Sequence, residues 1–396
     1  MSTPGNSNHT SIKSVRDLQL AGKSVFLRLD FNVPIEGGKV TDDSRIMEAL
    51  PTIKHCISAG AKVVIGSHLG RPDGKRDLKY SLEPVAAYLS GVVGQEVMLA
   101  DDCIGEGIEL LVKSQKSGSV LLLENLRFHA GEEANDPEFV MRLGALCEVY
   151  VNDAFGTAHR KHASTYGLPA LAQTKAMGFL IEKELKYLEP LVRDPAKPFY
   201  AVLGGSKVSD KIKTVDALLR AVKGICIGGA MAHAFTVAKG GTIPSGAKQP
   251  KKEDVEAAGS ILRDAKRKET PILLPVDTNA GFDIGPKTVE DFSKFLANAK
   301  TIFWNGPLGW FEKPEYAVGT FGVARAIAEL SAVKIVGGGD TVSAIKQSGV
   351  AEKFDHLSTG GGAVLEFIEN GSLPGIDILR QMYKRETTMS MTRTRI

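Results

Sequence analysis

The sequence lacks the features that mark several large classes of protein. Its four cysteines, Cys56, Cys103, Cys147 and Cys226, are far apart and form no C-x-x-C pair, which argues against a zinc or redox motif. No apolar run is long enough to span a bilayer, and residues 1–10 are polar and lack the apolar core of a signal peptide. We therefore expect a cytoplasmic protein with reduced thiols and no membrane partner.

The chain also lacks a strong charge of one sign and the commonest nucleotide fingerprints. A formal charge of +3 on 396 residues does not suggest wholesale binding to nucleic acid. Neither G-x-x-x-x-G-K-[ST] nor G-x-G-x-x-G occurs, so any nucleotide site must be built differently. A chain of this length exceeds the size of one hydrophobic core, which predicts two domains.

What the sequence does contain is a repeated order of apolar run, Gly-rich or polar turn, and helical pattern. Such short apolar runs are typical of buried parallel strands. The predicted strands are residues 24–29, 61–65, 120–123, 149–151, 199–203, 224–227, 272–275, 301–304 and 334–336. The predicted fold class is α/β, with two doubly wound lobes, each a mainly parallel sheet flanked by helices.

A helical pattern over residues 176–192 ends before Pro195 and Pro198, and prolines stop a helix. We place the boundary in this helix, with a first lobe over 1–185 and a second over 186–375. The stretch 188–198 would then act as a hinge. The tail from residue 384 onward is expected to fray.

In the first half, polar residues follow the predicted strands. Asp30 and Asn32 end the first strand, where they could present themselves to a hydroxylated ligand or simply hydrogen-bond their own turn. Arg71, Arg127 and Arg160 follow three later strands. The carboxyl ends of parallel strands meet at one sheet edge, so these residues are expected to converge.

Arg45 adds a fourth cation at a predicted helix start, where the helix dipole disfavours it; this placement hints at a bound anion. Converging guanidinium groups would form a bidentate receptor for phosphate and carboxylate. His159 and His162 could share a helical face, but their neighbours Arg160 and Lys161 repel a cation, so we expect no metal there.

In the second half, Gly-rich turns follow the strands. Lys207 and Lys211 lie four residues apart after Gly204 and Gly205, at a helix start that favours phosphate. A second glycine turn leads to Asp340, which could cap the following helix, as could its neighbour Thr341, or could hold Mg²⁺ against nucleotide phosphates. A third such turn spans residues 358–363.

Taken together, ten segments in order resemble the phosphoglycerate kinase family over residues 11–380. They are RLDFNVP, TDDSRI, SHLGRP, LLLENLRF, VNDAFGTAHRKHAS, GGSKVSDKI, DIGPKT, WNGPLGWFE, GGGDT and STGGGA. One departure is the segment between Asp277 and Asp283, which is considerably longer in most of the family. The resemblance also implies that the C-terminal helix, 376–396, packs back on the first lobe.

The resemblance implies two sets of site residues. In the first lobe, 3-phosphoglycerate or 1,3-bisphosphoglycerate would be bound by Asp30, Phe31, Asn32, Arg45, His68, Leu69, Gly70, Arg71, Arg127 and Arg160. In the second, ATP or ADP would be bound by Lys207, Lys211, Gly281, Asn305, Pro307, Glu312, Gly338, Gly339, Asp340 and Thr341, with Asp340 as the Mg²⁺ ligand.

The implied activity is reversible phosphoryl transfer in glycolysis by a monomer, with Arg45, Lys207 and Lys211 as catalytic residues. The acceptor is a carboxylate that is already ionised at neutral pH, so we expect no general base. A nicotinamide-dependent oxidoreductase should show a dinucleotide fingerprint, and none is present. A non-catalytic sugar-phosphate or nucleotide-binding protein remains the alternative.

Overall fold

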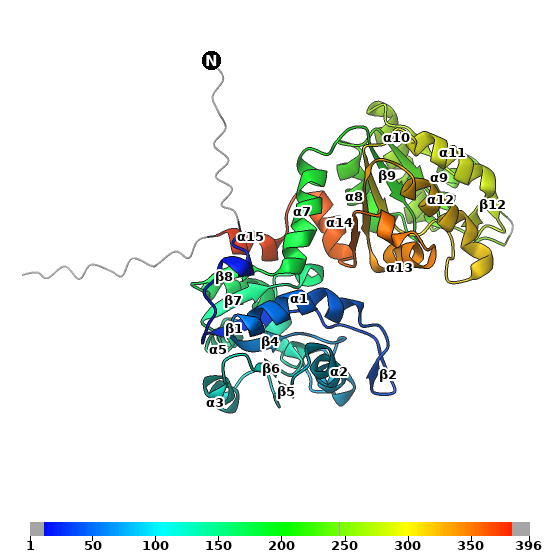
Figure 1. Ribbon diagram of the computed structural model, residues 1–396. Coiled ribbons are helices and arrows are strands. Elements are labelled where there is room, and N and C mark those ends of the chain that lie inside the picture. The colour runs from blue at the N-terminus through cyan, green and yellow to red at the C-terminus, as the bar shows by residue number, and fades with distance from the viewer. Residues whose placement is uncertain (1–11, 245, 382–396) are drawn as a thin grey trace, which may run out of the picture. The chain divides into compact units, whose positions relative to one another are not determined.

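The computed structural model describes residues 12–381 except residue 245, and the chain forms two compact units (Figure 1). Among the described residues, the first unit comprises 12–154, 160–182 and 374–381, and the second comprises 155–159 and 183–373. The boundary falls inside helix α7, Phe179–Arg193. The last described helix, α15 (Pro374–Arg380), packs on α6 and β8 of the first unit. Residues 382–396 of the expected C-terminal helix lie outside the described part.

The first unit is built on a parallel six-stranded sheet of order β5-β6-β4-β1-β7-β8. Its strands are β1 (Ser24–Arg28), β4 (Lys62–Gly66), β5 (Val97–Leu99), β6 (Val120–Leu122), β7 (Val149–Asn152) and β8 (Lys175–Met177). The α-helices are α1 (Ser44–Ser58), α2 (Glu83–Val93), α3 (Glu106–Ser114), α4 (Ala130–Ala134), α5 (Pro137–Gly144) and α6 (Leu168–Leu171). A small hairpin pairs β2 (Ile35–Glu36) with β3 (Lys39–Val40), and the short helical turns are η1 (Val15–Asp17), η2 (Leu78–Tyr80), η3 (Leu126–Phe128) and η5 (Ala163–Gly167).

The second unit has a parallel sheet of order β11-β10-β9-β14-β15-β16. Its strands are β9 (Phe199–Leu203), β10 (Gly224–Ile227), β11 (Ile272–Leu273), β14 (Thr301–Asn305), β15 (Val333–Gly337) and β16 (His356–Ser358). The α-helices are α8 (Ile212–Leu218), α9 (Met231–Ala238), α10 (Lys252–Arg267), α11 (Pro286–Leu296), α12 (Val318–Ala328), α13 (Gly339–Gln347) and α14 (Gly362–Asn370). The remaining elements are the hairpin β12 (Thr278–Asn279) with β13 (Asp283–Ile284) and the turns η4 (Phe155–Thr157), η6 (Ser209–Lys211), η7 (Pro314–Tyr316) and η8 (Ala351–Lys353).

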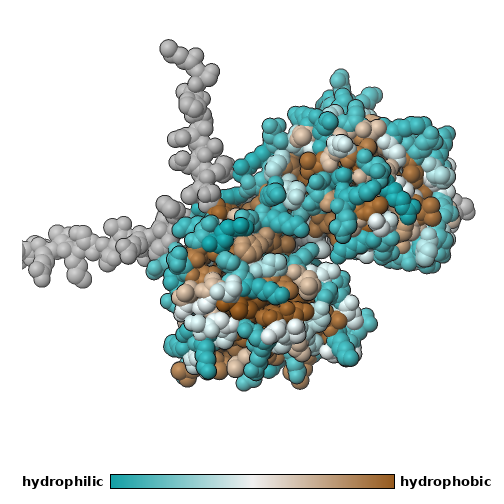
Figure 2. All heavy atoms as spheres, viewed as in Figure 1, coloured by the Kyte–Doolittle hydropathy of each residue, from teal (hydrophilic) through white to brown (hydrophobic). Residues whose placement is uncertain are grey.

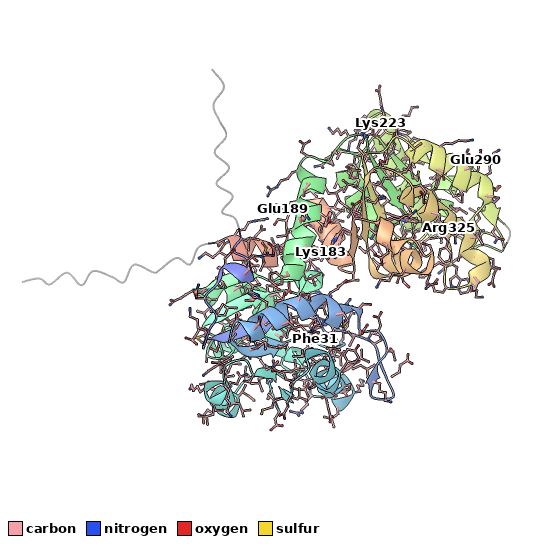
Figure 3. The ribbon with its side chains drawn as sticks, in the orientation of Figure 1. Phe31, Lys183, Glu189, Lys223, Glu290 and Arg325 are labelled. Carbon is pink, nitrogen blue, oxygen red and sulfur yellow. The ribbon has the colours of Figure 1, made fainter. Side chains whose placement is uncertain are left out.

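The central strands are apolar on both faces, which explains why they read as continuous apolar runs. In β1, Val25 and Leu27 belong to the core cluster on one face of the sheet, whereas Phe26 belongs to the cluster on the other. In the second unit, the fully buried Trp304 of β14 packs in the core cluster. Charged residues on the outer helices are exposed, as for Glu290 on α11 and Arg325 on α12, both labelled in Figure 3.

The predicted α/β class with two parallel sheets is confirmed, and all nine predicted strands are present. The three strands that were not predicted in the two large sheets, β5, β8 and β16, have only three residues each and lie at sheet edges. Figure 2 shows hydrophilic residues over most of the visible face of both units, with an apolar patch on the first. No described helix is long and apolar enough to cross a membrane.

The start of α7 is fixed to the first sheet by a buried carboxyl group. Asp153, directly after β7, is fully buried, and its Oδ1 accepts a hydrogen bond from the Ile181 N–H at 3.0 Å. Burial raises the pKa of Asp153 to about 7, although hydrogen bonds from Thr52 and the Ile181 amide act in the opposite direction. This carboxyl group therefore takes up a proton near neutral pH.

This raised pKa predicts a pH-dependent stability. The folded-state pKa of Asp153, about 7, lies above the unfolded value of about 3.9. The stabilisation of the folded state by the protonated carboxyl group is therefore fully present below about pH 4 and is lost as the pH rises through about 7. Relative to Asp153→Asn, the wild-type free energy of unfolding should fall by on the order of 2–3 kcal/mol between about pH 5 and 8, measured by urea titration. Asp194→Asn, at an exposed position, is the control, and its free energy of unfolding should change with pH as that of the wild type does. Parallel curves for wild type and Asp153→Asn would contradict the assignment.

Candidate functional site

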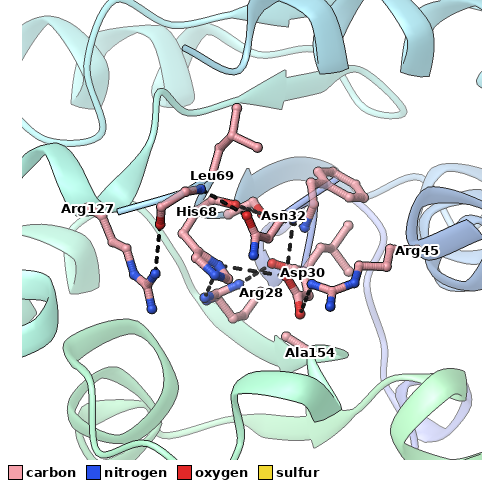
Figure 4. A network of polar contacts seen from close by, with 12 residues as sticks. Arg28, Asp30, Asn32, Arg45, His68, Leu69, Arg127 and Ala154 are labelled. Carbon is pink, nitrogen blue, oxygen red and sulfur yellow. Dashed lines mark hydrogen bonds and ion pairs between the residues drawn. The ribbon is translucent and has the colours of Figure 1, made fainter. Parts of the chain in front are cut away.

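The strand order of the first unit places β6, β4, β1 and β7 side by side, so the turns after these strands lie at one sheet edge (Figure 4). Asp30 and Asn32 follow β1, His68 follows β4, Arg127 follows β6, and Arg160 comes after β7. The strands that follow β1 in the chain first add on one side of it, beginning with β4, and then on the other side, beginning with β7. The site residues lie at this switch point. Such switch points are where α/β sheets bind ligands.

Asp30 and Asn32 form the local turn that was one of the two roles left open by the sequence, and they also contact residues outside that turn. Asp30 Oδ1 accepts from the Asn32 N–H at 3.2 Å, which is a local turn, while its Oδ2 accepts from Arg45 Nη1 at 2.9 Å. Asn32 Oδ1 accepts from the Gly70 N–H at 2.9 Å. Gly70 has φ +62°, and a Cβ there would lie 2.3 Å from the Tyr80 ring, so only glycine suits this position.

His68 lies in the middle of this edge and is almost fully buried. Its Nδ1 is 3.3 Å from Arg28 Nη2 and 3.8 Å from Asp30 Oδ1. Burial lowers the pKa of His68 well below its usual range, and nearby positive charges lower it further. These charges are the guanidinium groups of Arg28, Arg127, Arg160 and Arg45. The imidazole is therefore neutral. The four guanidinium groups around it give this region the positive potential that attracts an anion.

Sequence reasoning missed Arg28. It is fully buried, its Nε donates to Ser164 Oγ at 2.8 Å, and Ser164 Oγ in turn donates to Glu132 at 2.5 Å. Burial raises the pKa of Glu132, whereas the positive charge of Arg28 and the bonds from Ser164 lower it. The available signal was a cation at the end of an otherwise apolar strand.

The other predicted residues differ in exposure. Arg127 has a side chain only 4% exposed, donates to the Gly70 carbonyl at 2.9 Å and pairs with Glu133 at 3.1 Å. Arg71 is exposed after β4. Phe31 and Leu69 are buried in the core, so their side chains support the loops rather than enter the site. His159 and His162 do not share a helix, since His162 directly precedes η5.

In the second unit, the turns after β9, β14 and β15 line a cavity of 310 Å³. Its lining includes Gly205, Ser206, Lys207, Asp210, Lys211, Asn305, Gly306, Pro307, Gly338, Gly339, Asp340, Thr341 and Gly361. The cavity is thus formed by glycine-rich turns and lysines at the carboxyl edge of the sheet. Eight of the ten predicted nucleotide residues are among these, and the other two are Gly281 and Glu312.

The two predicted lysines have different surroundings. Lys211 Nζ donates to the Gly204 carbonyl at 2.6 Å and the Asn305 carbonyl at 3.2 Å. Burial lowers the pKa of Lys211 to about 8, although the negative charges of Asp340 and Asp210 raise it. Lys207 has a side chain 59% exposed, and its Nζ lies 3.8 Å from the Asp210 carboxylate.

Asp340 and Thr341 lie in the first turn of helix α13, but neither caps it, contrary to one of the two roles considered from the sequence. The N-cap is Gly338, with φ +101° and no side-chain cap. Thr341 is buried and its Oγ1 accepts from the Gly306 N–H at 2.7 Å, so it fixes the turn after β14. The exposed Asp340 carboxylate lines the cavity.

A second cavity in this unit, of 170 Å³, lies beside the short segment noted in the sequence. The segment forms the hairpin β12–β13, with Ala280 at φ +52° and Gly281 at φ +76°. Gly281 and Phe282 line the cavity together with residues of α9. Glu312 is exposed and lies outside the lining of both cavities.

Comparisons with known proteins agree with this geometry. The family model described as phosphoglycerate kinase matches residues 15–371. A protein named phosphoglycerate kinase from Anaeromyxobacter sp. (strain Fw109-5) is 51% identical over 395 residues, covering 93% of this chain and 99% of the relative. Another from Acidobacterium capsulatum is 48% identical over 401 residues, covering 93% and 99%.

Solved structures show the same relationship. The phosphoglycerate kinase from Coxiella burnetii has a TM-score of 0.84 and 38% identity, covering 94% of this chain and all of that chain (100%). The enzyme from Pyrococcus horikoshii OT3 has a TM-score of 0.82 and 34% identity, covering 93% and 98%. By family model, sequence and structure, the chain belongs to the phosphoglycerate kinase family.

Proposed function

We propose that this protein transfers a phosphoryl group reversibly between 1,3-bisphosphoglycerate and ADP, with 3-phosphoglycerate and ATP as the other pair. The observation that carries the proposal is the cluster of guanidinium groups around the neutral His68 at one sheet edge of the first unit. Phosphoglycerates carry both a phosphate and a carboxylate, and guanidinium groups suit both. The first unit would bind this acid through Asp30, Asn32, Arg45, His68, Arg127 and Arg160, with Arg71 and Gly70 at the rim.

The second unit would bind the nucleotide. Lys207 and Lys211 line the larger cavity with glycine turns whose backbone N–H groups can approach phosphates. Two of the three donors of the Lys211 ammonium go to carbonyls, which leaves the third for a phosphate oxygen. The smaller cavity at Gly281 and Phe282 would accept the base and sugar.

Mg²⁺ fits the donor set of the larger cavity. Asp340 presents a carboxylate there that is not used as the helix cap, and hard cations take oxygen ligands. Asp340 would hold the ion together with nucleotide phosphates. When bound, the ion would neutralise charge on the phosphoryl oxygens.

The transfer itself would depend on alignment and charge neutralisation rather than on a base. The acceptor carboxylate of 3-phosphoglycerate is ionised at neutral pH. Arg45 from the first unit and Lys207 from the second would stabilise the moving phosphoryl group, while Lys211 steadies the phosphates that stay on the nucleotide. We further propose that the enzyme acts as a monomer in the cytoplasm; the four cysteines, all free thiols, support a reducing compartment.

A coupled assay of ADP formation from ATP and 3-phosphoglycerate tests the activity. A phosphotransferase gives ADP only when both substrates are present. A non-catalytic sugar-phosphate or nucleotide-binding protein would bind the ligands without turnover, and that result would overturn the proposal.

Lys207→Ala should abolish most turnover, because its ammonium is assigned to the transferring group. Removing a preorganised donor of this kind costs about 2.7–4 kcal/mol, or about 10²–10³ in kcat. The affinity for 3-phosphoglycerate, measured by calorimetry, should stay near that of the wild type. Lys213→Ala, an exposed lysine on α8, is the control and should keep full turnover. Near-normal turnover in Lys207→Ala would remove this lysine from the mechanism.

Arg127→Ala should weaken 3-phosphoglycerate binding by about 10–100-fold, since a hydrogen bond to a charged group contributes about 1.5–3 kcal/mol. Binding of ADP should be unaffected, because the nucleotide residues belong to the other unit. Arg142→Ala, which removes an exposed arginine on α5, serves as the control. Weakened ADP binding in Arg127→Ala would show that the division of ligands between the units is wrong.

The assignment of one substrate to each unit predicts closure in the ternary complex. In-line transfer needs reacting atoms within about 3–3.5 Å, so the two ligands must be brought together. Closure should need both ligands, because only together do they interact with both units. Small-angle X-ray scattering should show a smaller radius of gyration only in the ternary complex. An unchanged radius would count heavily against hinge closure.

A further inference from the structure

Three side chains with metal-ligand chemistry meet in the first unit, apart from the residues assigned to substrate. Asp102 and Cys103 lie between β5 and α3, and His129 lies between η3 and α4. One carboxylate oxygen, the sulfur and one imidazole nitrogen all lie within 4.8 Å of one another. This is the set of three ligand types, carboxylate, thiolate and imidazole, from which protein zinc sites are built.

Asp102 already contacts both of the other residues. His129 Nε2 lies 2.6 Å from Asp102 Oδ1, and the Cys103 N–H donates to the same oxygen at 2.6 Å. The three ligand atoms are therefore held close together by contacts that the structure already makes.

We propose that Asp102, Cys103 and His129 form a binding site for a borderline divalent cation such as Zn²⁺. Around such an ion, with bonds of about 2.0–2.3 Å, tetrahedral ligands lie about 3.3–3.6 Å apart. Asp102 Oδ1 and His129 Nε2, now 2.6 Å apart, must separate by about 0.7–1.0 Å to reach this geometry. The sulfur ligand distinguishes this site from the all-oxygen ligand sets that Mg²⁺ prefers.

The exposure of the cluster to solvent favours a cation. The side chains of His129 and Asp102 are 30% and 42% exposed, so an ion can enter from solvent and keep a water as its fourth ligand.

No sequence motif indicates this site, since the cysteines form no C-x-x-C pair. Asp102 and Cys103 follow β5, and His129 comes after β6, and these two strands pair in parallel. The cluster is therefore assembled by the sheet, which brings together residues that are 26 positions apart.

The test is titration of the metal-free, nucleotide-free full chain with Co²⁺, followed by displacement with Zn²⁺. The wild type should bind one equivalent with a near-ultraviolet thiolate-to-cobalt charge-transfer band and the visible intensity of a four-coordinate ion. Cys103→Ser should lose the band and that equivalent. Cys147→Ser is the matched control, because Cys147 packs on the same core cluster, and it should retain both.

A second variant protects the test against misfolding. His129→Gln changes a partly exposed side chain and leaves the Cys103 thiol in place. It should weaken Co²⁺ binding at least tenfold. With metal removed by a chelator, the circular dichroism spectrum of each variant should match that of the wild type, which shows that the variants fold. Absence of the band in the wild type, its persistence in Cys103→Ser, or unchanged affinity in His129→Gln would overturn the proposal.

Discussion

Parallel strand pairing is the constraint on which both sites depend. In each six-stranded sheet, every described pair of neighbours runs in the same direction, so the turns that leave the strands gather at one edge. In the first unit these turns carry guanidinium groups, and in the second they carry glycines and lysines. The same architecture therefore gives two candidate sites, whose different chemistry comes from the residues in and next to these turns.

Gathering so many cations at one edge has an energetic cost, and the structure offsets it locally. Asp30 pairs with Arg45 at 2.9 Å, and Glu133 pairs with Arg127 at 3.1 Å. The remaining repulsion is visible in the pKa of Arg127, which burial lowers and which neighbouring guanidinium groups lower further. A bound phosphate or carboxylate would relieve this repulsion. Part of the binding free energy would thus come from strain that exists in the ligand-free receptor.

The sequence was informative where a local strand–turn–helix pattern is compatible with only one structural interpretation. It predicted the central strands and the arginines after them, because an apolar run followed by a polar turn identifies a strand end. It missed Arg28, the last residue of β1, and it could not show Glu132, whose role depends on contacts with Ser164. These contacts join segments that are distant in the chain, and no local pattern records them.

The two lysines of the second unit illustrate how burial separates roles that the sequence presents as equivalent. Lys211 is held by two carbonyls and has a pKa lowered to about 8, so it is a fixed donor whose position is set before any ligand arrives. Lys207 is 59% exposed and close to a single carboxylate at 3.8 Å. A fixed donor suits phosphates that remain in place, whereas a long exposed side chain can follow a group that moves. Their different surroundings therefore match the different parts of the transfer assigned to them.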